Sequence, residues 1–154
     1  VDAERTSEFA AMAKSYGKQS VFSRAIDVTP DWRAALDILI ESGVTRVLTS
    51  GQRPTVMEGA GVIAAMVRYA AGRIEILPGS GIRANNLRLI LERTGCTQLH
   101  MSAHMVAHDM SAANGNGICF TASEVPKEGC YKLIDPNKVE EIARMLKGDT
   151  NVQL

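Results

Sequence analysis

Residues 72–82 read Gly-Arg-Ile-Glu-Ile-Leu-Pro-Gly-Ser-Gly-Ile, and this stretch decides the fold class that we expect for the chain. The apolar run before Pro78 is typical of a β-strand, and the glycine turn after it leads into a helical pattern from about Ala84 to Gly95. Glycine permits a sharp bend and close approach of the backbone. A helix that starts directly behind such a turn favours binding of a phosphate or carboxylate.

The same order of strand and helix recurs on both sides of this stretch. Candidate strands begin near residues 20, 45, 74 and 98, and helical patterns follow the first three. A helix over residues 2–16 precedes them, and further helices are expected to start at Thr29-Pro30 and at Pro54. This βα repetition predicts a parallel sheet. Two architectures fit it: about four strands from the second half of a (β/α)₈ barrel, or an open doubly wound sheet.

The remaining residues are expected to belong to the same domain, which covers 1–154. Residues 104–134 are interpreted as a long irregular excursion that contains a turn cluster at 114–117 and a short strand around 118–121. Asp135-Pro136 is expected to start a final helix, and residues 149–154 a frayed tail. Because the chain opens on a helix at Val1, we expect it to be the later part of something longer.

Composition narrows the classes of partner. Seventeen basic and seventeen acidic residues cancel, so the net charge does not favour nucleic acid or an anionic membrane. No run approaches the roughly 18 apolar residues of a membrane span, and the first residues lack the pattern of a signal peptide. Three widely spaced cysteines without a Cys-x-x-Cys pair indicate reduced thiols. We therefore expect a cytoplasmic protein with a small partner.

Ligands of parallel α/β sheets bind beyond the carboxyl ends of the strands, and this rule selects the candidate site residues. Arg24 and Asp27 follow the first strand and are the candidate catalytic pair, with the guanidinium as an anion ligand and the carboxylate as a base or a metal ligand. The candidate anion-binding residues are small and polar: Ser50, Gly51, Gly79, Ser80, Gly81 and Ser102. Within the strands, Arg46 and Glu75 are expected to be satisfied either by each other across neighbouring strands or by water.

Residues 100–110 read His-Met-Ser-Ala-His-Met-Val-Ala-His-Asp-Met and combine the imidazole and thioether donors that suit copper. Helical spacing would place the three histidines on one side. We expect His100 on a strand and His104 in the following loop, however, so a chance cluster is the competing interpretation. No zinc pattern of standard spacing exists in the chain. The metal ligands therefore stay unassigned.

Four ordered segments carry a resemblance to a known family. They are Val-Phe-Ser-Arg-Ala-Ile-Asp at 21–27, Arg-Val-Leu-Thr-Ser-Gly at 46–51, Leu-Pro-Gly-Ser-Gly-Ile at 77–82 and Leu-His-Met-Ser-Ala at 99–103, together with Glu58-Gly59. In this order they resemble the signature segments of the CutC copper homeostasis family. The resemblance implies a (β/α)₈ barrel of which this chain is similar to the second half. It also implies a cytosolic role in copper homeostasis, with copper as the possible cofactor and no established reaction.

The chain departs from the family pattern at three positions. Ser23 stands where the family usually has His, Ile26 where it has Phe, and Ser80 where it has the middle glycine of the turn. A serine at that position narrows the accessible backbone angles and adds a hydroxyl donor.

Two functions and two states of assembly follow as expectations. The favoured function is copper homeostasis with a bound copper ion. The alternative is a TIM-barrel enzyme or binding protein for a small phosphorylated or carboxylated ligand at the strand ends. Because four barrel strands leave two uncovered edges, we expect either a homo-oligomer or assembly with a missing N-terminal half.

Overall fold

The computed structural model describes residues 1–109 and 129–147, so the turn cluster at 114–117, the short strand at 118–121 and the tail at 149–154 lie outside the described residues. The chain divides into two compact units, Val1–Met101 and Ser102–Asp149. Each unit is treated by itself below. Within the described residues, no helix combines the length and the apolar character needed to cross a membrane.

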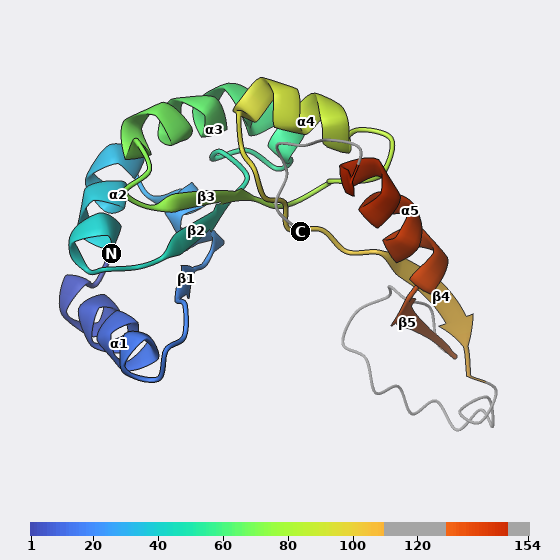
Figure 1. The fold of residues 1–154 in the computed structure, drawn as a ribbon, viewed down its shortest axis with the longest axis horizontal. Coiled ribbons are helices and arrows are strands. Elements are labelled where there is room, and N and C mark those ends of the chain that lie inside the picture. The colour runs from blue at the N-terminus through green and yellow to red at the C-terminus, as the bar shows by residue number, and fades with distance from the viewer. Residues whose placement is uncertain (110–128, 148–154) are drawn as a thin grey trace. The chain divides into compact units, whose positions relative to one another are not determined.

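The first unit is built from βα repeats, as the sequence predicts. Its elements in chain order are α1 (Ala3–Ser15), β1 (Val21–Phe22), the 3₁₀ helix η1 (Arg24–Val28), α2 (Trp32–Glu41), β2 (Arg46–Thr49), α3 (Val56–Ala70), β3 (Glu75–Pro78) and α4 (Leu87–Thr94). Helices α2, α3 and α4 follow one another along one side of the strands (Figure 1).

The three strands form a parallel sheet in the order β1-β2-β3. Arg46 lies opposite Glu75 in the register, and the two side chains form an ion pair of 2.7 Å between Nη2 and Oε2. The predicted pairing of these two charges is therefore confirmed. Gln19 Oε1 also accepts a hydrogen bond of 3.0 Å from the Arg46 guanidinium, so this cation has partners on both sides.

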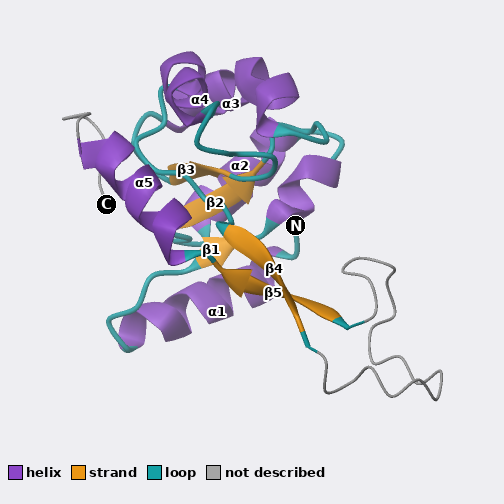
Figure 2. Ribbon diagram, turned by 90° about the vertical axis from the view of Figure 1, so that its right-hand side faces the viewer, coloured by secondary structure: helices purple, strands orange, loops and turns teal. Residues whose placement is uncertain are grey.

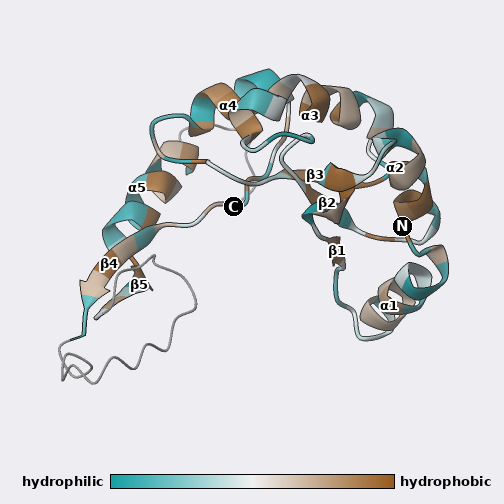
Figure 3. Ribbon diagram, turned by 180° about the vertical axis from the view of Figure 1, so that it is seen from behind, coloured by the Kyte–Doolittle hydropathy of each residue, from teal (hydrophilic) through white to brown (hydrophobic). Residues whose placement is uncertain are grey.

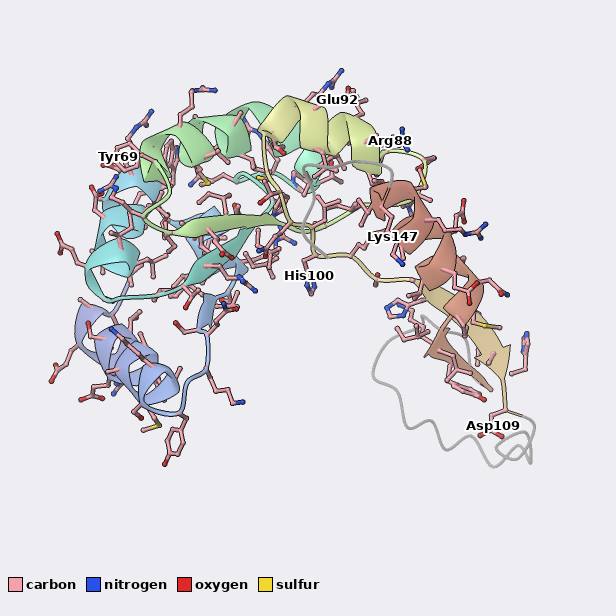
Figure 4. All side chains as sticks on the ribbon, in the orientation of Figure 1. Tyr69, Arg88, Glu92, His100, Asp109 and Lys147 are labelled. Atoms are coloured by element: carbon pink, nitrogen blue, oxygen red, sulfur yellow. The ribbon has the colours of Figure 1, made fainter. Side chains whose placement is uncertain are left out.

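The core lies between the sheet and the helices on its covered face. Side chains from these elements are fully buried, among them Ile26, Leu36, Leu39, Val47, Val56, Ile63, Met66, Leu87 and Ile90. Figure 3 shows hydrophobic residues on the strands and on the helices that cover them, interspersed with hydrophilic ones. Helices α2 and α3 are also joined by Tyr69, labelled in Figure 4, whose hydroxyl donates to Asp37 over 2.6 Å and whose ring meets Trp32 edge-on.

Three predicted helix starts were placed too early, because other side chains cap the helices. Asp31, not Thr29, accepts from the first N–H groups of α2, while the Thr29 hydroxyl donates to the carbonyl of Ile26. Thr55 caps α3, so this helix begins at Val56. Helix α4 begins at Leu87 rather than near Ala84, since Asn86 Oδ1 accepts from Arg83 N and closes a turn first.

The first and fourth predicted strands are shorter than the sequence indicated. The run from 19 to 26 gives the two-residue β1, after which Ser23 accepts from Ala25 N and starts η1. The fourth strand is reduced to a single parallel bridge between Gly79 and His100. His100 N donates to the carbonyl of Pro78, and Pro78 itself lacks an N–H with which to continue the ladder.

The second unit differs from the irregular excursion that the sequence suggested. Strands β4 (His104–His108) and β5 (Cys130–Ile134) pair antiparallel, and α5 (Pro136–Lys147) follows (Figure 2). As predicted, Asp135 caps the last helix, by accepting from Asn137 N and Lys138 N. Lys138 Nζ donates to the carbonyl of His104 over 2.7 Å, so α5 is fixed to the start of β4.

Candidate functional site

The strand ends of the first unit bring together most of the predicted site residues. Arg24 and Asp27 lie in η1, directly after β1, while Ser50 and Gly51 follow β2. The turn at 79–81 follows β3. Because the sheet is parallel, these segments all lie at the carboxyl ends of its strands.

Asp27 accepts several hydrogen bonds at these strand ends. One carboxylate oxygen, Oδ1, accepts from Thr49 Oγ1 over 2.5 Å and from Gln52 N over 3.1 Å. The other, Oδ2, accepts from Ser50 N over 2.9 Å and from Arg24 Nε over 2.8 Å. The side chain is only 7% exposed. Asp27 thereby ties η1 to the end of β2.

These contacts also set the charge of Asp27. Burial alone would raise its pKa, but hydrogen bonds from Thr49, Arg24, Ser50 and Gln52 favour the carboxylate and hold the pKa below its usual value. An ionised carboxylate whose lone pairs are already occupied is a positioning group in the geometry described here. A role for Asp27 as a catalytic base stays a prediction.

Arg24 is the cation of the site. Its Nε donates to Asp27, and its Nη2 donates to Ser50 Oγ over 2.5 Å. A longer contact of 3.5 Å joins Nη2 to the carbonyl of Arg53. The side chain is 42% exposed, so part of it also faces solvent. Arg24 can therefore meet an external anion while it remains bound to Asp27.

The glycine turn is fixed to the start of α3. Val56 N donates to the carbonyl of Ser80, and Ser80 Oγ donates to the carbonyl of Pro54 over 2.9 Å. Ser80 adopts a φ of 117°, a region that glycine populates readily and other residues avoid. The hydroxyl noted in the sequence is thus present, but it binds within the protein, and the backbone angle explains why a glycine suits this position.

Several N–H groups of the predicted anion site donate to acceptors inside the first unit. Ser50 N donates to Asp27, Gly51 N to Thr49 Oγ1 over 2.9 Å, and Gly79 N to the carbonyl of Thr49 over 2.9 Å. An anion at this edge would therefore depend on other donors. Ser102, the last predicted member, is exposed and belongs to the second unit. The anion site stays a prediction.

The histidine-rich segment is not helical. His100, labelled in Figure 4, bridges to Gly79 in the first unit, whereas His104 and His108 begin and end β4. His104 is thus on a strand rather than in a loop. At the other end of this strand, His108 Nδ1 lies 3.3 Å from Cys130 Sγ, and this pair was not foreseen from the sequence. The available signal was the equal length of His-Met-Val-Ala-His and Cys-Tyr-Lys-Leu-Ile on either side of a turn cluster.

Residues 1–109 and 129–147 offer few side chains that could bind a metal ion together. Nowhere in these ranges do three His, Cys, Asp or Glu side chains gather closely enough to hold one ion. Cys96 is buried, and burial raises the pKa of its thiol to about 11, against a smaller opposing effect of the hydrogen bond with Thr94. Cys96 is therefore a poor ligand in this environment.

Comparisons with a family model and with curated proteins point to the same family. The model of the CutC family matches residues 1–105. A family protein CutC from Treponema denticola is 42% identical over 146 residues, which are 95% of this chain and 58% of that protein. The human copper homeostasis protein cutC homolog is 36% identical over 126 residues, 82% of this chain and 46% of its own length. The chain thus spans about half the length of these relatives.

A solved structure supports the same assignment. The crystal structure of CutC from Streptococcus agalactiae superimposes with a TM-score of 0.58 at 35% sequence identity. The match covers 65% of this chain and 49% of that one.

Proposed function

Because this chain belongs to the CutC family, we propose that it acts in copper homeostasis and that copper ions are its cargo. The observation that carries the proposal is the match to the family model together with the names of the human and mouse relatives. The chain also contains soft donors of the type that copper prefers, namely seven methionines and three cysteines. A cytoplasmic location is part of the same proposal.

The test is direct titration with Cu(I) under anaerobic conditions. We expect binding that competes with a chromophoric Cu(I) chelator and leaves the far-UV circular dichroism of the protein unchanged. Binding no stronger than that of a cysteine-free protein of similar size would refute direct copper binding.

A second candidate function is binding of a small phosphorylated or carboxylated ligand at the strand ends. It is favoured by one observation, the partly exposed side chain of Arg24, whose guanidinium donates to Ser50 at the end of β2. If such a site exists, phosphate at constant ionic strength should raise the melting temperature, and Arg24→Gln should remove this effect. Arg68→Gln, at the far end of α3, is the matched control. Arg24→Gln is a cleaner probe of the site than Gly81→Val, because the φ of 73° at Gly81 would strain any side chain.

The barrel architecture is proposed on the same basis. The βα repeats and the parallel sheet of three strands support this proposal, and so does the length of the relatives, which are about twice as long as the matched region. We take the chain to contribute the later βα units of such a barrel, with either a second copy or a segment like the N-terminal half of the relatives completing the sheet.

A further inference from the structure

The hairpin of the second unit holds a thiol and an imidazole in direct contact. Cys130 Sγ and His108 Nδ1 are 3.3 Å apart, at the end of the strand pair where β4 finishes and β5 begins. His108 is exposed and Cys130 is half-buried, so an ion from solvent can approach both. Figure 4 labels Asp109, the residue that follows His108. Neither side chain belongs to the strand-end site described above.

The register of the two strands explains why these side chains meet. His108 lies directly opposite Cys130, and the next pair is joined by a hydrogen bond of 2.7 Å from Asp109 N to the carbonyl of Gly129. Pairs alternate along an antiparallel ladder, so His108 and Cys130 occupy a position without mutual backbone hydrogen bonds. Side chains are closest at such positions. The contact is therefore imposed by the backbone.

We infer that His108 and Cys130 together form a binding site for Cu(I), an inference that rests on the proposed function and assigns it a location. With the bond lengths of about 2.3 and 2.0 Å that zinc forms to sulfur and nitrogen, a tetrahedral angle at the metal separates the two ligand atoms by about 3.5 Å. The observed separation of 3.3 Å is close to this value, so Cys130 and His108 can supply two ligands of a Cu(I) ion whose remaining ligands come from solvent or an incoming thiolate. Binding replaces the thiol proton by the metal, and the proton leaves to solvent.

The type of the two ligands favours Cu(I) over zinc. Zinc sites in proteins use three or four protein ligands, and no such group occurs in the parts of the chain that the structure describes. A thiolate with one imidazole is a soft pair, which suits Cu(I). His104 and Val106 share the face of β4 with His108, but His104 lies opposite Ile134 at the other end of the hairpin. The exposed side of the ion would be open to an incoming thiolate, as exchange of copper between carriers requires.

The test measures Cu(I) affinity of the full chain by anaerobic competition with bathocuproine disulfonate. Cys130→Ser and His108→Gln should each weaken binding at least tenfold. Cys96→Ser and His104→Gln are the matched controls, a buried thiol and a histidine on the same strand face, and both should bind like the unmodified chain. X-ray absorption at the copper edge should show sulfur and nitrogen neighbours, and the sulfur shell should vanish in Cys130→Ser.

The outcomes separate this inference from the function on which it rests. Unmodified affinity in both Cys130→Ser and His108→Gln would overturn the site and leave copper binding elsewhere in the chain. The same conclusion would follow if Cys119→Ser, rather than Cys130→Ser, abolished the sulfur shell. Absence of Cu(I) binding by the unmodified chain would instead overturn both proposals. Circular dichroism of each variant identifies any that fails to fold. If Cys130→Ser does not fold, the X-ray absorption spectrum of His108→Gln decides, because an unchanged nitrogen shell in that variant would overturn the site.

Discussion

Asp27 shows how one side chain can organise the ends of two strands. Its carboxylate accepts from Thr49, Ser50, Gln52 and Arg24, and an amide in its place would turn an N–H₂ group toward some of these donors. Asp27→Asn should therefore lower the free energy of unfolding by about 2–3 kcal/mol at neutral pH, as expected for hydrogen bonds to a charged group. Urea unfolding measures this loss. Asp2→Asn, at the exposed cap of α1, should cost little.

The same carboxylate should contribute to acid unfolding. The pKa of Asp27 is lowered in the folded state, so its contribution to stability is present above the unfolded pKa of about 3.9 and is lost as the pH falls through the folded value. Between pH 5 and pH 2 the unmodified chain should thus lose more stability than Asp27→Asn. Parallel stability curves for the two proteins over this range would contradict the assignment.

Ser80 carries a backbone strain that its hydroxyl partly offsets. A φ of 117° is costly for any residue with a Cβ, while Ser80 Oγ gains one exposed hydrogen bond to Pro54. Ser80→Ala keeps the strain and loses the bond, whereas Ser80→Gly loses both. The glycine variant should therefore exceed the alanine variant in unfolding free energy by about 1 kcal/mol or more. Thermal and urea unfolding of the pair would settle the sign.

At the scale of elements, α3 packs onto the end of β2 through backbone contact. A Cβ added to Gly59 would lie 1.9 Å from the carbonyl oxygen of Ser50, and neither partner is a flexible side chain. Gly59→Ala should cost about 3 kcal/mol or more, because the helix must move away from the strand. Gly61→Ala, two residues further and with open space around its Cβ, should instead gain up to about 1 kcal/mol. Equal effects of the two variants would contradict this packing.

The sequence could predict elements where local signals decide them, and it was less informative where distant partners do. Helical spacing and glycine stops located α1, α3 and α5 to within a few residues. The charge pair of Arg46 and Glu75 was also anticipated, because strand alternation can place both on one face of the sheet, and the register then sets them opposite each other. The cap at Asp31 competed with an equally plausible Thr29-Pro30, and only the folded chain distinguishes them. Likewise, the contact of His108 with Cys130 depends on a strand register that no local pattern specifies.

The candidate site followed the same division. Placement of Arg24, Asp27, Ser50 and Gly79 at one sheet edge follows from the parallel order of the strands. The use of their N–H groups does not, because Gly51 N and Gly79 N both turn to Thr49 rather than outward. The site residues and their place at the strand ends could thus be predicted from the sequence. The hydrogen-bond acceptor of each N–H group could be identified only from the folded backbone.

At the scale of the whole molecule, the outer edge of β1 is the surface that we expect to associate. Among the described residues, β1 pairs with a strand on one side only, in the order β1-β2-β3. A groove of about 300 Å³ is lined by residues of α1 and β1, among them Phe9, Val21 and Phe22. Helix α1 adds three exposed apolar side chains at helical spacing, Phe9, Met12 and Tyr16. An open strand edge beside exposed apolar surface favours pairing with another chain.

We therefore predict that the chain self-associates through α1 and β1. Sedimentation velocity at micromolar concentration should show dimers or larger species, since a second copy can cover both the edge and the apolar stripe. Phe9→Glu should shift this equilibrium toward monomer by at least tenfold, because it places a charge in the centre of the contact. Val28→Glu alters an apolar side chain that is 85% exposed elsewhere in the first unit, and it should leave association unchanged. A folded, stable monomer of the unmodified chain across this concentration range would show that α1 and β1 tolerate solvent without a second copy.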